Sequence, residues 1–145
     1  MKKPRIVVDT NVFISALMKP LGWERKIVEG FILCRFDLVV SPEVMAEYRQ
    51  VFGRAKFSKL DSTNVATLLS LIASEARVVF PSQRLNVSKD EDDNRFYECA
   101  EAGGVDYIVT GNSKHFTASH KGTRIVNARQ FLELLEEQGG NGYDH

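Results

Sequence analysis

The segment from Asp90 to Asn112 constrains the fold of this chain more than any other. Four consecutive acids, Asp90 to Asp93, begin a helical pattern, and an apolar run from Val105 to Val109 follows it. A short apolar run that stops at Thr110-Gly111-Asn112 is typical of a buried parallel strand. Sites in open α/β sheets lie at the carboxyl ends of the strands, so we expect a site beside these polar residues.

The helix that begins at the acidic run offers a structural explanation for its acids. Negative charge in a first turn is favoured by the helix dipole, and Ser88 with Glu91 matches a capping box. Phe96 defines the inward face of this helix, and Glu91 points away from it. Helical phase favours both Asp92 and Asp93 as site residues and does not choose between them.

The N-terminal segment has the same form. Arg5 to Val8 is a second short apolar run, and it ends in Asp9-Thr10-Asn11 before the apolar segment Val12 to Met18. An acid in this position either caps the following helix or belongs to a site at the sheet edge. If the first and fourth strands are neighbours where the strand order reverses, Asp9 meets the loop at 110–112 there.

Alternating strands and helices predict the fold class. Five short strands that alternate with helices favour a parallel sheet covered on both faces, and right-handed crossovers place all the carboxyl ends on one edge. In the helix over 23–34, Trp23, Ile27, Phe31 and Cys34 are expected to point inward. The expected strands are 5–8, 37–40, 77–80, 105–109 and 124–126, and the expected helices are 12–18, 23–34, 42–52, 61–76, 90–103 and 127–138.

Size and composition predict a single globular domain. The 145 residues are 43% hydrophobic, enough for a real core, and we expect one domain over 1–138 with a flexible, glycine-rich tail at 139–145. The 19 basic residues balance the 19 acidic ones, so local patches or metal ions would have to hold a polyanion. Cys34 and Cys99 are interpreted as core thiols, which suits the cytoplasm. No signal sequence and no membrane span is expected.

A carboxylate interrupts the apolar stripe of the helix that begins at Ser41-Pro42. Glu47 lies between Val44 and Val51 at the spacing of one helix face, where an edge position that reaches water is the alternative. Converging carboxylates repel one another unless a divalent cation neutralises them. Oxygen ligands select Mg²⁺ or Mn²⁺, and these ions promote phosphodiester hydrolysis. Asp106 begins its strand, more than about 10 Å from this edge, and is interpreted as structural.

Three motifs in this order resemble those of the PIN-domain family. They are VVDTNVFISAL, SPEVMAEY and DEDDNRFYECAEAGGVDYIVTGN, and the resemblance covers residues 4–137. It implies a flavodoxin-like three-layer α/β/α sandwich with a five-stranded parallel sheet. It also implies a Mg²⁺- or Mn²⁺-dependent endoribonuclease, often the toxin of a toxin–antitoxin pair. RNA, single-stranded or structured, is the implied substrate, and a homodimer and a small antitoxin are the implied partners.

The motif match assigns catalytic and metal-binding roles residue by residue. Asp9 and Glu47 match the first two metal-binding acids of the family. The third matches Asp93, and this match favours Asp93 over Asp92. Asn11 and Thr110 match polar residues that orient the site.

One position departs from the family pattern. Where many relatives have TGD, this chain has Thr110-Gly111-Asn112, and Asn112 can offer a metal only a neutral carbonyl oxygen. Asp90 or Asp92 could supply the missing charge. Weaker metal binding, or a strong preference for one ion, is expected from this change.

Substrate contacts are less specific in the sequence. Lys114 and His115 follow the site loop, and Arg95 lies on the acidic helix, so these three are candidates for phosphate contacts. Each is also explained as a solvated surface charge. The same two interpretations apply to the basic residues Lys19, Arg49, Arg54 and Lys56.

Other functions fit the sequence less well. A receiver-like signalling module would need a phosphoacceptor aspartate where Phe80-Pro81 stand, and a haloacid-dehalogenase-type phosphatase would need a second aspartate in place of Asn11. The remaining alternative is a catalytically weak or inactive PIN module that binds RNA or a protein partner.

Overall fold

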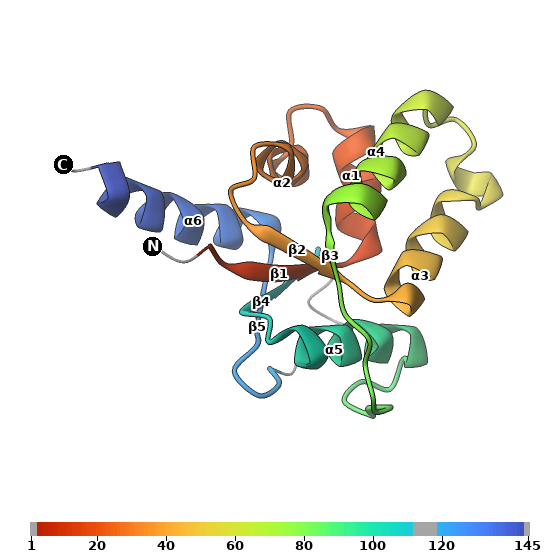
Figure 1. Cartoon of the computed structure of the whole chain (residues 1–145). Helices are drawn as coiled ribbons and strands as arrows, with labels where there is room; N and C mark the ends of the chain where they lie inside the picture. The colour runs from red at the N-terminus through yellow and green to blue at the C-terminus, as the bar shows by residue number, and fades with distance from the viewer. Residues whose placement is uncertain (1–2, 112–118, 144–145) are drawn as a thin grey trace.

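The computed structural model describes residues 3–111 and 119–143 (Figure 1). Strands and helices alternate through these residues. The strands are β1 (Arg5–Val8), β2 (Asp37–Val40), β3 (Arg77–Val78), β4 (Tyr107–Val109) and β5 (Arg124–Val126). The helices are α1 (Thr10–Met18), α2 (Trp23–Ile32), α3 (Pro42–Phe52), the 3-10 helix η1 (Ala55–Phe57), α4 (Ser62–Glu75), α5 (Glu91–Gly103) and α6 (Ala128–Tyr143).

All five strands run parallel, in the order β3-β2-β1-β4-β5. The chain builds outward from β1 to β2 and β3, and then returns to the other side of β1 to form β4 and β5. In the register, Ile6 lies opposite Leu38 of β2 and Tyr107 of β4. The strand order therefore reverses between β1 and β4, as predicted, and the carboxyl ends of these strands form the crevice.

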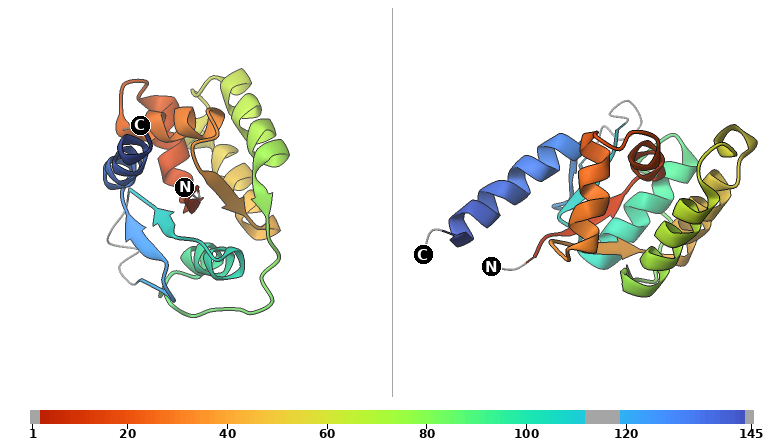
Figure 2. Two further views of the ribbon diagram at one scale, coloured as in Figure 1. Left: turned by 60° about the vertical axis from the view of Figure 1, so that its left-hand side comes forward. Right: turned by 90° about the horizontal axis from the view of Figure 1, so that it is seen from above.

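Helices cover both faces of the sheet (Figures 1 and 2). Helix α5 contacts β1, β2 and β4 on one face, whereas α1, α2 and α6 lie on the other. Helix α3 contacts both α1 and α5, so it joins the two helical layers. Ile6, Val7 and Val8 of β1 have no solvent exposure, as expected for a strand covered on both faces. The predicted three-layer sandwich with a five-stranded parallel sheet is confirmed.

The end of α5 depends on two glycines. A Cβ atom on Gly103 would lie 2.7 Å from Cγ1 of Val39, so only glycine lets this helix approach β2 so closely. Gly104 has a φ of 58°, the left-handed conformation that commonly terminates helices. The chain can therefore turn directly from α5 into the segment that forms β4.

Two buried polar side chains of α5 hold the segment that connects β3 to α5. The Asn94 side chain accepts hydrogen bonds from the backbone N–H groups of Val87 (3.0 Å) and Ser88 (2.7 Å), and it donates one to the Ser88 carbonyl (2.9 Å). Glu98 accepts one from the Leu85 N–H at 2.8 Å. These contacts fix the approach to α5 and, with it, the place of the acids at 90–93.

Two side chains of the α2 region are exposed, although the sequence predicted that they would point inward. Helix α2 ends at Ile32, and Cys34 adopts a left-handed φ of 57° while the Arg35 N–H bonds back to the Gly30 carbonyl. This turn directs Cys34 to solvent, so the prediction of a core thiol was wrong for Cys34 and right for Cys99. Trp23, the first residue of α2, is 41% exposed.

Several element boundaries also differ from the predictions. Asp90, rather than Ser88, is the N-cap of α5, and its carboxylate accepts a hydrogen bond from the Asp92 N–H at 2.9 Å. Strand β3 ends at Val78, and β4 begins only at Tyr107. Helix α6 continues past the predicted end at 138 to Tyr143, and the flexible tail at 139–145 stays a prediction. None of the helices in residues 3–111 and 119–143 is long and apolar enough to cross a membrane.

Candidate active site

Asp9 directly follows β1 at the carboxyl edge of the sheet. It occupies the N-cap position of α1, yet its carboxylate makes no capping hydrogen bond to that helix. Instead, Thr110, which directly follows β4, donates its hydroxyl to Asp9 Oδ2 at 2.9 Å. The Asp9 N–H also donates to the Val109 carbonyl at 2.9 Å. Both side chains are buried, so these contacts fix the Asp9 carboxylate at the crevice between β1 and β4.

Glu47 comes to the same edge on α3. Its half-buried carboxylate accepts a hydrogen bond from the hydroxyl of Thr10 at 3.0 Å. The next residue, Tyr48, is fully buried and donates its hydroxyl to the Val8 carbonyl at 2.6 Å, which ties α3 to the end of β1. Glu47 is therefore held beside Asp9.

The third contribution comes from the start of α5. Asp93 is buried, with 8% of its surface exposed, whereas Asp90 and Asp92 are exposed. All three line the cleft, but Glu91 faces solvent and pairs with Arg95. Helical phase had predicted this difference between Glu91 and its neighbours.

The predicted acids share one cleft of about 160 Å³. Asn11 also lines this cleft, and Thr110 reaches it through its bond to Asp9. The acids that line it are Asp9, Glu47, Asp90, Asp92 and Asp93. We call this hollow the acidic cleft.

Burial and the neighbouring charges in the acidic cleft disfavour the ionised form of Glu47. Burial raises the pKa of Glu47 most, and the negative charges of Asp92 and Asp9 raise it further. The hydrogen bond from Thr10 and the positive charge of Arg54 lower this pKa and only partly compensate. A divalent cation in the cleft would relieve the same repulsion.

The ligands that the cleft offers suit a hard cation. Its candidate ligands are carboxylate and amide oxygens, with no cysteine or histidine among the described residues of its lining, and this is the set that Mg²⁺ and Mn²⁺ prefer. However, among the residues that the structure describes, no three acidic, histidine or cysteine side chains form a ready-made metal centre. The acids would have to draw closer together around a cation.

Some predicted site residues are not brought to the cleft. Arg95 pairs with Glu91 and with Glu98 (3.0 Å) on its own helix, and it does not line the cleft. The predictions for Asn112, Lys114 and His115 lie outside the described residues. Asp106 accepts a hydrogen bond from the Arg5 N–H at 2.9 Å at the opposite end of the strands, in keeping with a structural role.

Sequence reasoning assigned no role to Thr10, the residue that bonds to Glu47. The sequence feature that could have indicated this role is the position of Thr10 next to Asp9, at the end of a predicted strand. Arg54 was one of several basic residues with two interpretations, and the structure places it in the lining of the cleft. Its position just after α3 explains this placement, because the same helix carries Glu47.

The fold and the acidic cleft together define an α/β/α protein with a carboxylate-lined site at the point where strand order reverses. The sequence profile of the PIN domain matches residues 5–114. The chain belongs to the PIN-domain family, whose members are generally nucleases.

One relative and one solved structure extend this comparison. The uncharacterized protein MJ1680 of Methanocaldococcus jannaschii is 27% identical over 93% of this chain and 94% of its own length. The crystal structure of VapBC2 from Rickettsia felis, bound to a DNA fragment from its promoter, contains a chain with the same fold. That likeness has a TM-score of 0.56 and 17% identity, and it covers 85% of this chain and 98% of the other.

Proposed function

We propose that this protein is a Mg²⁺- or Mn²⁺-dependent endoribonuclease. The observation that carries the proposal is the shared cleft, to which Asp9, Glu47 and Asp93 come from the end of β1, from α3 and from α5. Membership of the PIN-domain family supports a nuclease, and the oxygen ligands support a hard divalent cation. The cation and the RNA substrate are the specific parts of the proposal.

The acids have distinct tasks in this function. Asp9, Glu47 and Asp93 would hold the cation, and Asp90 or Asp92 would add negative charge. A bound divalent cation supplies charge neutralisation and an activated water for phosphodiester hydrolysis. Asn112 is proposed as a further, neutral ligand.

Neighbouring side chains keep these acids in position. The hydroxyls of Thr110 and Thr10 hold Asp9 and Glu47 in fixed orientations, as second-sphere partners of metal ligands commonly do. Asn11 lies exposed at the cleft and can donate a hydrogen bond to the substrate. Arg54 contributes a positive charge to the lining and can bind a phosphate oxygen.

A biological setting completes the proposal. We propose that the chain acts in the cytoplasm as the toxin of a toxin–antitoxin pair, as a homodimer and with a small antitoxin protein as its partner. The support is the family resemblance, together with the fold shared with the VapBC2 structure. Co-purification of the protein with the product of an adjacent short reading frame would test the partnership.

Cleavage of RNA tests the enzymatic proposal. The purified protein should cut labelled RNA, single-stranded or structured, with Mn²⁺ and should stop when a chelator is added. Asp9→Asn should abolish the activity, whereas Asp106→Asn should keep it because the new amide oxygen can still accept the bond from Arg5. Undiminished cleavage by Asp9→Asn would identify a contaminating nuclease and contradict the proposal.

The alternative function is a catalytically weak or inactive PIN module that binds RNA or a protein partner. Two observations favour it. The described acids do not form a ready-made metal centre, and Asn112 stands where many relatives have an acid. A folded protein that binds RNA but does not cut it with either cation would support this alternative.

A further inference from the structure

A second hollow lies beside the acidic cleft on the same edge of the sheet. It has a volume of about 630 Å³ and lies between α1, the start of α2 and the start of α6. Asn11 lines both hollows, so they adjoin at this residue. The residues that matter for its chemistry are Asn11, Ser15, Lys19, Trp23, Glu24 and Arg129. We call this second hollow the Trp23 groove.

One face of α1 forms the wall that leads away from the acidic cleft. Asn11 and Ser15 are spaced four residues apart on α1, and Lys19 is the C-cap residue four positions farther on, so the three follow one another along this wall. The rise of an α-helix places Lys19 about 12 Å farther along the axis than Asn11. A nucleic-acid strand whose phosphate lies in the acidic cleft would therefore pass polar groups and then a positive charge.

Trp23 lies at the far end of this path and is partly exposed, with two cations on long, flexible side chains over its ring. Its side chain is 41% exposed, although its position in the helix pattern predicted burial. The Lys26 ammonium lies 4.6 Å and the Arg129 guanidinium 5.5 Å from the ring centroid. Exposed aromatic rings next to cations are the means by which proteins bind single-stranded nucleic acids without sequence preference.

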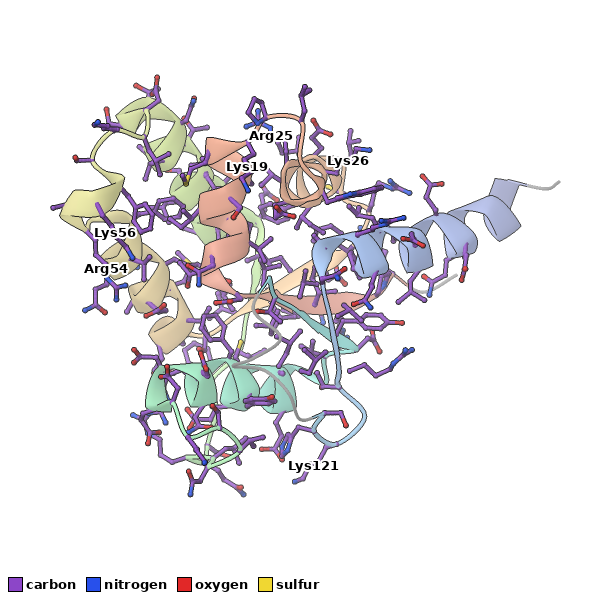
Figure 3. The ribbon with its side chains drawn as sticks, turned by 180° about the vertical axis from the view of Figure 1, so that it is seen from behind. Lys19, Arg25, Lys26, Arg54, Lys56 and Lys121 are labelled. Atoms are coloured by element: carbon purple, nitrogen blue, oxygen red, sulfur yellow. The ribbon has the colours of Figure 1, made fainter. Side chains whose placement is uncertain are left out.

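The charges around the groove favour a polyanion. Among the described residues, Glu24 is the one acid in this lining, and Glu133 pairs with Arg129 at 3.0 Å. Lys19 and Arg129 in the lining and Lys26 over the ring outweigh these two acids. Lys19, Lys26 and Arg25 gather around the corner where α1 meets α2 (Figure 3). This positive patch stands out because the whole chain has no net charge.

Positive charge also lies on the other side of the acidic cleft. Arg54 lines the cleft, and Lys56 follows it beyond the end of α3 (Figure 3). The acids are thus flanked by cations on two sides. Phosphates on either side of the cleavage point would meet these cations, while the scissile phosphate lies at the acids.

We propose that the Trp23 groove binds the single-stranded part of the RNA next to the scissile phosphate. A base stacks on Trp23, and Lys19 and Arg129 contact phosphates. This inference rests on the proposed ribonuclease function for its substrate. A protein segment is the less favoured occupant, because the wall between Asn11 and Lys19 is polar.

The single tryptophan of the chain makes this proposal directly measurable. The protein of natural sequence is titrated with a short single-stranded RNA in a chelator, so that binding is separated from cleavage. Stacking on Trp23 should quench its emission in a saturable way. A fluorescently labelled copy of the same RNA reports binding independently, by its anisotropy, and the matching DNA strand tests whether the ribose matters.

Three variants give the test its specificity. Trp23→Ala should weaken binding roughly tenfold, the effect of losing one stacked base. Lys19→Gln should lower the slope of log affinity against log salt by about 0.7, the effect of losing one phosphate contact on a single strand. Lys121→Gln is the matched control, because Lys121 lies far from Lys19 beside α5 and should leave the slope unchanged (Figure 3).

The outcomes separate this inference from the proposed function. With Mn²⁺, Trp23→Ala should raise KM and leave kcat nearly unchanged, because the groove binds and does not react. Binding of labelled RNA without any change in Trp23 emission would overturn the inference even if the protein cuts RNA. The absence of RNA binding by anisotropy would overturn it as well. Quenching of Trp23 emission by RNA without cleavage would support RNA binding in the Trp23 groove and contradict the proposed nuclease function.

Discussion

The hydroxyl of Thr110 donates a hydrogen bond of 2.9 Å to Asp9 Oδ2, although the two residues are 101 positions apart in the chain. The bond is possible because β1 and β4 are neighbours, with Val8 in register with Val109. It joins the ends of the two central strands at the acidic cleft. The orientation of Asp9 therefore depends on the sheet order itself.

Removing this hydroxyl should impair the site more than the fold. In Thr110→Val the side chain keeps its shape but cannot donate to Asp9. We expect a loss of roughly 10- to 100-fold in Mn²⁺ affinity and in RNA cleavage, the usual effect of losing a second-sphere partner. Calorimetric titration with Mn²⁺ and initial cleavage rates measure the two effects. Thr110→Ser keeps the hydroxyl and should restore both, and equal losses in the two variants would contradict the assigned role.

The raised pKa of Glu47 predicts a pH-dependent cost in stability. Because the folded state binds this proton more tightly than the unfolded state, ionised Glu47 destabilises the fold, and the cost grows as pH rises above about 4.5. In chelator at pH 7, Glu47→Gln should therefore melt at a higher temperature than the natural protein. The difference in melting temperature should shrink as the pH falls below about 4.5, where Glu47 becomes protonated in both the folded and the unfolded protein.

Addition of Mn²⁺ provides the complementary measurement for Glu47. The cation should raise the melting temperature of the natural protein at pH 7, and it should raise that of Glu47→Gln much less. The glutamine can still accept the hydrogen bond from Thr10, so the comparison isolates the charge. A Glu47→Gln protein that is less stable at pH 7 would show that burial and repulsion do not destabilise ionised Glu47 in the folded protein.

The segment before α5 should loosen when Asn94 is truncated. Asn94→Ala removes the acceptor for the Val87 and Ser88 N–H groups, and we expect a loss of about 1–3 kcal/mol in the free energy of unfolding. Urea denaturation measures this loss, and hydrogen exchange should speed up at 87 and 88. Asn64→Ala, on the exposed surface of α4, is the control and should cost less than about 0.5 kcal/mol.

The two cysteines should differ in reactivity. Burial raises the pKa of Cys99 to about 12, so this thiol stays protonated and inaccessible at pH 8, whereas Cys34 is exposed. Iodoacetamide should modify one site in the folded protein and two after denaturation. Peptide mapping should locate the first modification at Cys34. Modification of Cys99 at a similar rate in the folded protein would contradict its burial.

The sheet and its edge were predictable because they depend on strong local patterns. Short apolar runs that end in polar residues gave the strands, and their alternation with helices gave the parallel order. The polar ends at Asp9 and Thr110 then indicated where the crevice would lie. The period of the helix predicted that Glu91 would point away from the cleft and that Asp92 and Asp93 would face it, but the choice of Asp93 over Asp92 came from the family resemblance.

Other features depend on contacts that sequence patterns do not contain. The bond from Thr10 to Glu47 joins two helices, and no periodicity within either helix predicts it. The predicted helix continued to Cys34, but α2 ends at Ile32 because the chain turns at Cys34, which has a left-handed φ. Trp23 had the phase of a core residue, but it is the first residue of α2 and is 41% exposed.

The distance in sequence between Asp9 and Thr110 has a consequence for synthesis. A growing chain has made Asp9, Glu47 and Asp93 before it makes β4 and Thr110, the residue that directly follows this strand. A nascent or truncated form that lacks β4 and Thr110 also lacks the Val109 carbonyl and the Thr110 hydroxyl, which both bond to Asp9. Under the proposed ribonuclease function, a nascent chain would therefore attack its own message only weakly until β4 and Thr110 have been made.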